Sequence, residues 1–134
     1  MNGTFFSVII PSYNREKFIQ RTIDSILKQT YQNFEIIEAS VENCLREQLK
    51  NYERDECIAI IDPPRKGLAE AARKSLCESK NLKQLLYLSC NPESLIHDLK
   101  DFLRAEWIIE QVIPFDFFPK TKHLETLVFL RPEE

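Results

Sequence analysis

Glycine is nearly absent from this chain of 134 residues, which contains only Gly3 and Gly67. Loops that bring the backbone close to a phosphate or a cofactor usually need several glycines, because a Cβ atom would block the approach. The sequence therefore excludes a self-contained dinucleotide-binding loop of the Rossmann type and a P-loop.

A net positive charge, closely spaced cysteine pairs and long apolar runs are also missing. The net charge is −3 and the pI is near 5.5, so no overall positive field attracts nucleic acid. No apolar run approaches the roughly 20 residues of a membrane helix, and the first residues do not resemble a signal peptide. No C-x-x-C pair exists, which argues against zinc fingers and dithiol redox chemistry. We therefore expect a cytoplasmic protein without membrane contact and with reduced cysteines at Cys44, Cys57, Cys77 and Cys90.

Short apolar runs alternate with segments in which apolar residues recur at helical spacing. The runs predict six strands, near 7–10, 34–38, 57–61, 84–89, 107–115 and 124–130. The helical spacing predicts four helices, near 15–29, 41–52, 68–79 and 92–103. We expect a single α/β domain over 1–134, a three-layer Rossmann-like sandwich with a mostly parallel sheet covered on both faces. The expected strand order is 2-1-3-4-6-5, with strand six antiparallel because its link to strand five is too short for a crossover helix.

Three polar turns follow strands of the expected sheet, at 11–15, 62–67 and 89–92. Ligands of open α/β sheets bind outside the carboxyl ends of the strands. Each turn alone is typical of an ordinary connection from a strand to a helix. Because all three turns are expected at the carboxyl ends of the strands, on one side of the sheet, we expect a functional site there.

Cys90 and Glu125 are the candidates for chemistry that the residues themselves suggest. Cys90 lies between a strand and the start of a helix, where the helix dipole favours a thiolate nucleophile. The alternative is a small, half-buried cysteine without a chemical role. Glu125 opens the last apolar run and is a candidate general base, with His123 two residues earlier on the same face. The alternative for Glu125 is a solvated charge at the mouth of the strand.

Three motifs in the second part of the chain carry a resemblance to a known family. They are Asp-Pro-Pro-Arg-Lys-Gly-Leu at 62–68, Tyr-Leu-Ser-Cys-Asn-Pro at 87–92, and Asp-Phe-Phe-Pro-Lys-Thr-Lys-His-Leu-Glu-Thr at 116–126. With these motifs in this order, residues 34–134 resemble the C-terminal catalytic half of the S-adenosylmethionine-dependent RNA uracil-5-methyltransferases.

The resemblance implies a role for several residues. Cys90 matches the cysteine that adds to C6 of uracil, and Glu125 matches the base that removes the C5 proton. Asp62 matches the acid of the Asp-Pro-Pro-Arg turn, near the target base and the methyl donor. The implied partner is RNA, the implied donor is S-adenosylmethionine, and no metal is expected. Three further residues are expected to bind the substrate: Arg65, Asn91 and His123.

Residues 1–37 resemble a different family. The segments 7–15 and 26–37 are similar to the opening of the family-2 glycosyltransferases, which have a nucleotide-sugar-binding A fold. This resemblance implies that Pro11, Tyr13 and Asn14 lie beside a uridine nucleotide. The acidic pair that should end the second strand is absent, and so is a metal-binding Asp-x-Asp motif.

The two resemblances together suggest a chimera. Our main hypothesis is a truncated or chimeric RNA 5-methyluridine methyltransferase-like domain. It would keep the uracil-attacking half of the site, lack the glycine-rich donor loop and be inactive alone. The alternatives are a non-catalytic engineered or recombined α/β scaffold and a nucleotide-sugar-binding protein. Titration with S-adenosylmethionine and with uridine diphosphate distinguishes these three hypotheses.

Overall fold

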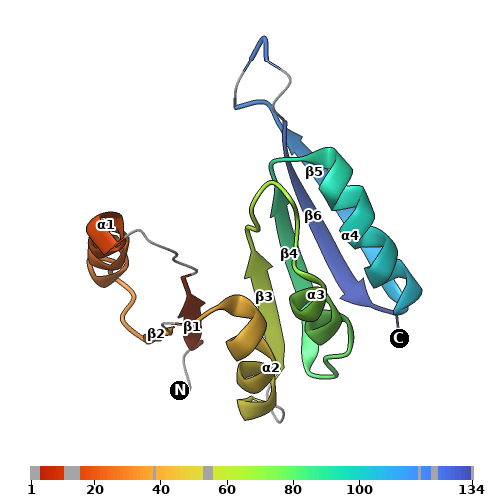
Figure 1. Ribbon diagram of the computed structural model, residues 1–134. Helices are drawn as coiled ribbons and strands as arrows, with labels where there is room; N and C mark the ends of the chain where they lie inside the picture. Colours follow the sequence, from red (N-terminus) through yellow and green to blue (C-terminus); the bar gives the residue numbers. More distant parts are fainter. Residues whose placement is uncertain are drawn as a thin grey trace. The chain divides into compact units, whose positions relative to one another are not determined.

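The computed structural model describes residues 4–10, 16–37, 39–52, 56–117, 119–121 and 124–133. The chain divides into two compact units, Met1–Cys44 and Leu45–Glu134, which are drawn in Figure 1. In the described part of the chain, no helix is both long enough and apolar enough to cross a membrane.

The first unit contains a strand, a helix and a second strand: β1 (Phe6–Ile9), α1 (Glu16–Leu27) and β2 (Phe34–Ile37). The two strands pair in parallel along their whole length. The ring of Tyr31 lies edge-on against the ring of Phe6, with 5.5 Å between the ring centroids. The predicted elements and the predicted pairing of these two strands are therefore both observed.

The second unit is built on a four-stranded sheet in the order β3-β4-β6-β5. β3 and β4 are parallel, whereas β6 is antiparallel to both of its neighbours, as the sequence predicts. A helix, α2 (Val41–Asn51), begins in the first unit and continues into the second. The remaining elements are β3 (Cys57–Ile61), α3 (Glu70–Cys77), β4 (Leu82–Ser89), α4 (Pro92–Arg104), β5 (Trp107–Phe115) and β6 (Glu125–Pro132).

The core of the second unit lies on one face of this sheet. In β4, Leu85, Tyr87 and Ser89 alternate toward that face, and an extra residue in β4 opposite the step from Cys57 to Ile58 keeps Leu82 on it too. Figure 1 shows α3 and α4 on the same side of the sheet. The buried apolar cluster, against which Leu45 of α2 also packs, comprises Leu76, Leu82, Leu85, Tyr87, Leu95, Phe102, Trp107, Val128 and Leu130.

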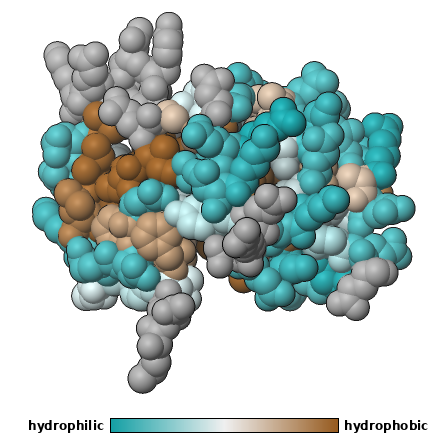
Figure 2. Space-filling view, turned by 90° about the horizontal axis from the view of Figure 1, so that it is seen from below, coloured by the Kyte–Doolittle hydropathy of each residue, from teal (hydrophilic) through white to brown (hydrophobic). Residues whose placement is uncertain are grey.

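The predicted single six-stranded sheet is not found, because the described strands form one sheet of two strands and one of four. The three-layer arrangement is not found within the second unit either, since α2, α3 and α4 all pack against the same cluster. On the other face of β3, Ile58 and Ile60 are 63% and 70% exposed. Apolar side chains are also visible at the surface in Figure 2. An apolar run predicts a strand but contains no information on its partner or on how many of its faces are covered.

Candidate functional site

Cys90 and Glu125 flank the same end of the ladder between β4 and β6. The last residue pair of this antiparallel ladder is Ser89 with Thr126. Cys90 follows Ser89 and Glu125 precedes Thr126, on neighbouring strands of a type that lie about 4.8 Å apart. Both residues are half-buried. A thiol and a carboxylate therefore stand next to the last residue pair at this end of the sheet.

Asp62 lies at the same end of the sheet, directly after the last residue of β3. Ile61 pairs in parallel with Tyr87, so Asp62 is level with Leu88, two residues before Cys90. The Asp62 side chain is exposed. In Figure 1 the arrowheads of β3 and β4 and the start of β6 lie at the same end of the sheet. Two of the three predicted turns, 62–67 and 89–92, thus follow strands at the same end of the sheet, whereas the turn 11–15 lies outside the described residues. The site and the chemical roles of its residues stay predictions.

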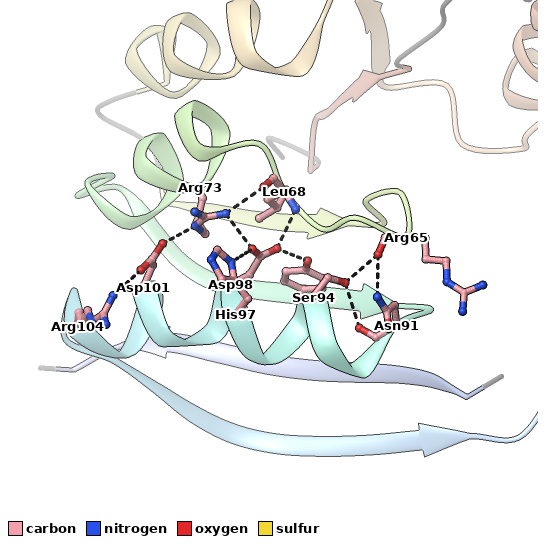
Figure 3. Close-up of polar contacts among 10 residues, drawn as sticks. Arg65, Leu68, Arg73, Asn91, Ser94, His97, Asp98, Asp101 and Arg104 are labelled. Carbon is pink, nitrogen blue, oxygen red and sulfur yellow. Dashed lines mark hydrogen bonds and ion pairs between the residues drawn. The ribbon is translucent and has the colours of Figure 1, made fainter. Parts of the chain in front are cut away.

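The turn after β3 is attached to the start of α4 through Asn91. The Asn91 side chain accepts a hydrogen bond from the backbone N–H of Glu93 and so caps α4. Its Nδ2 donates to the Arg65 carbonyl oxygen at 3.0 Å, and the Ser94 hydroxyl donates to the same oxygen at 3.0 Å. Figure 3 shows these bonds, with the exposed Arg65 side chain directed away from them. The Asn91 amide therefore holds the turn, a role that the sequence analysis did not predict.

A buried carboxylate, Asp98, is the second point of attachment. Its side chain is 1% exposed and accepts hydrogen bonds from the Leu68 backbone N–H at 2.8 Å and the Tyr87 hydroxyl at 2.6 Å. The Arg73 guanidinium donates to its other oxygen at 2.8 Å. The sequence analysis missed this residue. Its position between Leu95 and Phe102, on the buried stripe of α4, was the available signal, because a charge there needs buried partners.

The charges of this cluster stabilise one another. Burial alone would lower the pKa of Arg73, but its hydrogen bond with Asp101 and the charges of Asp98 and Asp101 raise it overall. The hydrogen bond from Arg73 lowers the pKa of Asp101. Burial, and then the hydrogen bond to Asp98, raise the pKa of Tyr87. Tyr87 therefore remains a hydrogen-bond donor at neutral pH. Among the described residues, every buried side-chain nitrogen and oxygen has a hydrogen-bond partner.

Four of the predicted site residues lie outside the described residues: Pro11, Tyr13, Asn14 and His123. The predicted uridine-nucleotide contacts and the predicted role of His123 in binding the substrate therefore stay predictions. Within the described ranges, no group of three or more His, Cys, Asp or Glu side chains is arranged to hold a metal ion.

Cys77 is expected to react slowly with alkylating reagents. Burial, together with the charge of Asp101, raises the pKa of the Cys77 thiol to about 11, from an ordinary value of 9.0. Since the thiolate is the reacting form, we expect iodoacetamide at pH 8 to modify Cys77 about 100-fold more slowly than an unperturbed thiol. Timed labelling followed by site-resolved mass spectrometry measures the rate. In guanidinium chloride the protection should vanish, and equal rates in folded and unfolded protein would contradict the prediction.

Comparison with known protein families agrees with the motifs at this edge. The family model described as tRNA (Uracil-5-)-methyltransferase matches residues 28–133. The chain belongs to this family. The match of the tRNA (uracil-5-)-methyltransferase family includes residues 28–37, which the sequence analysis had placed in the glycosyltransferase-like segment. The glycosyltransferase resemblance and the chimera stay predictions without support from this match.

This chain matches only a small part of the length of its curated relatives. A 23S rRNA (uracil(747)-C(5))-methyltransferase of Pyrococcus furiosus is 43% identical over 72 residues, which are 54% of this chain and 17% of that protein. A tRNA/tmRNA (uracil-C(5))-methyltransferase of Sulfurovum sp. is 39% identical over 77 residues, 58% of this chain and 20% of that protein. The matched region is thus at most a fifth of each of these two relatives.

Solved structures share the fold at low sequence identity. A precorrin-6y C5,15-methyltransferase from Geobacter metallireducens has a TM-score of 0.61 at 8% identity, covering 96% of this chain and 67% of that one. An rRNA methylase from Streptococcus thermophilus has a TM-score of 0.59 at 14% identity, covering 96% and 73%. These likenesses establish a Rossmann-like methyltransferase fold for a member of the tRNA (uracil-5-)-methyltransferase family.

Proposed function

We propose that this chain carries the uracil-attacking half of an RNA uracil-C5-methyltransferase site, with Cys90 as the nucleophile and Glu125 as the general base. The observation that supports this most directly is the ladder pair of Ser89 with Thr126, because Cys90 and Glu125 are the residues that flank this pair. Family membership supplies the substrate class, uracil in RNA.

The chemistry needs a thiol and a base at adjacent positions, because the two atoms of uracil that react are bonded to each other. Cys90 Sγ adds to C6, and the electron pair of the C5–C6 double bond moves toward the C4 carbonyl, which makes C5 a nucleophile. After C5 has gained a substituent, Glu125 removes the C5 proton, the double bond forms again and the sulfur leaves. For Asp62, which follows β3 at the same end of the sheet, we propose a contact with the uracil ring. A base within an RNA helix must leave its stack to reach this edge.

The family implies S-adenosylmethionine as the methyl donor, but the described residues do not fit a donor cradle. Gly67 is the only glycine among them, and a Cβ atom at Gly67 would lie 2.6 Å from Asp98 Oδ2. The space beside Gly67 is therefore occupied by the Asp98 side chain and is not open to a methyl donor. We expect no methyl transfer by this chain alone, and the proposal is limited to the attack on uracil.

Hydrogen exchange at C5 tests the proposal without a methyl donor. The chain is incubated in D2O with a single-stranded RNA that contains uridine, and the RNA is digested to nucleosides. Addition of Cys90, deuteration of C5 by solvent, removal of the C5 proton by Glu125 and loss of the thiol would leave 5-deuterouridine. Mass spectrometry should then show a gain of about one mass unit on uridine and none on cytidine.

Three variants assign the roles in this experiment. Cys90→Ala should reduce the exchange to the rate without protein, and Glu125→Gln should reduce it at least about 100-fold. Cys77→Ala, which removes a thiol from α3, should leave the exchange unchanged. Absence of exchange with folded wild-type protein would overturn the proposed function. Exchange that survives Cys90→Ala would show that the nucleophile is another group.

A further inference from the structure

The segment 62–68 connects the proposed site to the buried carboxylate of Asp98. Asp62 begins this segment at the edge of the sheet, and Leu68 ends it where its backbone N–H donates to Asp98 Oδ2 at 2.8 Å. The same oxygen accepts from the Tyr87 hydroxyl of β4, and the other oxygen accepts from Arg73 of α3. One side chain of α4 therefore joins the segment 62–68 to a helix and a strand.

The segment 62–68 is also fixed in its middle. The Gly67 N–H donates to the Pro64 carbonyl oxygen at 2.8 Å, and Gly67 has a φ of +83°, which favours glycine. The Arg65 carbonyl oxygen accepts from Asn91 and Ser94 at the start of α4. Figure 3 shows that these contacts join the segment 62–68 at Arg65 to the start of α4. Asp62 lies three residues before Arg65, and Cys90 directly precedes Asn91.

Burying the Asp98 carboxylate in the core has a desolvation cost, so the presence of a charge at this position needs an explanation. An apolar side chain at 98 would pack against the cluster without the desolvation cost of a carboxylate. It would leave the Leu68 N–H, the Tyr87 hydroxyl and one side of the Arg73 guanidinium without an acceptor. The carboxylate therefore fixes these three groups in one arrangement, which an apolar residue of similar size does not do.

We propose that Asp98 is a positioning residue for the attack on uracil: it holds the segment 62–68 against the start of α4 and so keeps Asp62 beside Cys90. The inference rests on the proposed function. Asp98 itself is buried away from the edge of the sheet and touches neither Cys90 nor a substrate placed there.

The test compares Asp98→Asn with Tyr87→Phe in the full chain. Asp98→Asn keeps the size of the side chain but replaces one of the two acceptor oxygens by an NH2 group. This group must face either Arg73, which repels it, or the Leu68 N–H and the Tyr87 hydroxyl, so the side chain cannot keep all three bonds in place. Tyr87→Phe removes one hydrogen bond of the same carboxylate and leaves the bond of Leu68 in place, so it is the matched control for a loss of stability alone. Amide hydrogen exchange at Leu68 and C5 exchange on RNA are measured for both variants, after thermal unfolding has confirmed that each is folded.

In Asp98→Asn the amide of Leu68 is expected to exchange at least about 10-fold faster, because its acceptor is lost or misplaced. The rate constant for C5 exchange at saturating RNA should fall by about 10- to 100-fold, with the KM for RNA changed less than threefold, because Asp62 is misplaced while the bulk of the surface that meets RNA is retained. In Tyr87→Phe both the Leu68 amide and the C5 exchange should stay within threefold of wild type.

The outcomes separate this inference from the proposed function. If wild-type protein gives no C5 exchange, the proposed function and the part of the inference that depends on it both fail, and the Leu68 amide still decides whether Asp98 holds the segment. If C5 exchange occurs and Asp98→Asn lowers it no more than Tyr87→Phe, the positioning role is wrong.

If Asp98→Asn does not fold, Ser94→Ala, which removes one donor to Arg65, should show a smaller fall in the rate constant at unchanged KM. An unchanged rate constant in Ser94→Ala would then overturn the inference.

Discussion

Replacing Phe102 with alanine is expected to lower the free energy of unfolding of the Leu45–Glu134 unit by about 3–5 kcal/mol. Phe102 is 0% exposed and packs edge-on against Trp107, with 5.6 Å between the ring centroids and an interplanar angle of 73°. The change removes the apolar area that α4 buries there and leaves a cavity that the surrounding side chains fill only in part. Urea unfolding followed by circular dichroism measures the loss.

The neighbouring residue on the same helix provides the control for Phe102→Ala. Leu103 is 49% exposed, so Leu103→Ala should change the free energy of unfolding by no more than about 0.5 kcal/mol. Both variants remove a large apolar side chain from α4 and have a similar effect on helix propensity. Equal losses in the two variants would show that the packing of α4 against the sheet differs from the one described.

Gly67→Ala is expected to lower the free energy of unfolding by about 2–4 kcal/mol, from left-handed backbone strain and from displacement of a buried hydrogen-bond acceptor. The residue has a φ of +83°, and an added Cβ atom would lie 2.6 Å from Asp98 Oδ2 and 3.2 Å from Ser94 Cβ. Asp98 cannot move aside easily, because that oxygen also holds Leu68 and Tyr87. Chemical unfolding of the purified variant measures the effect.

The contribution of Asp98 to this effect is separated by a double-mutant cycle. In an Asp98→Ala background the approach to Asp98 Oδ2 is absent, and the backbone strain and the approach to Ser94 Cβ remain, so Gly67→Ala should cost about 1–2 kcal/mol. An equal cost in both backgrounds would mean that contact with Asp98 does not explain the requirement for glycine.

The locally encoded parts of this fold are the ones that the sequence predicts well. The start of α4 follows from Asn91 and Pro92, because an asparagine cap and a proline in the first turn are sufficient to begin a helix. The antiparallel course of β6 follows from the short link after β5. The meeting of Cys90 with Glu125 follows from these two local facts together, since each residue flanks the same end of the paired strands.

The parts that depend on distant partners could not be predicted in the same way. The predicted pairing of β1 with β3, which the two described sheets do not contain, and the exposure of Ile58 and Ile60 depend on what lies next to each strand, and an apolar run does not contain that information. Three of the partners of Asp98, which are Leu68, Arg73 and Tyr87, lie 11 to 30 positions away in the sequence, and only His97 is a neighbour. Its burial is therefore a property of the folded packing, although a charge on the apolar stripe of α4 was a visible clue.

The single tryptophan of the chain, Trp107, gives the protein an optical reporter in only one of its two units. Its indole is 3% exposed, and its Nε1 lies 3.4 Å from the Cys77 carbonyl oxygen, to which it donates. Emission from this indole changes when α3, α4 and the four-stranded sheet come apart, because all of them surround it. The Met1–Cys44 unit does not contribute to tryptophan emission, so a melting curve from this emission reports the unfolding of the Leu45–Glu134 unit, whereas amide circular dichroism reports both units.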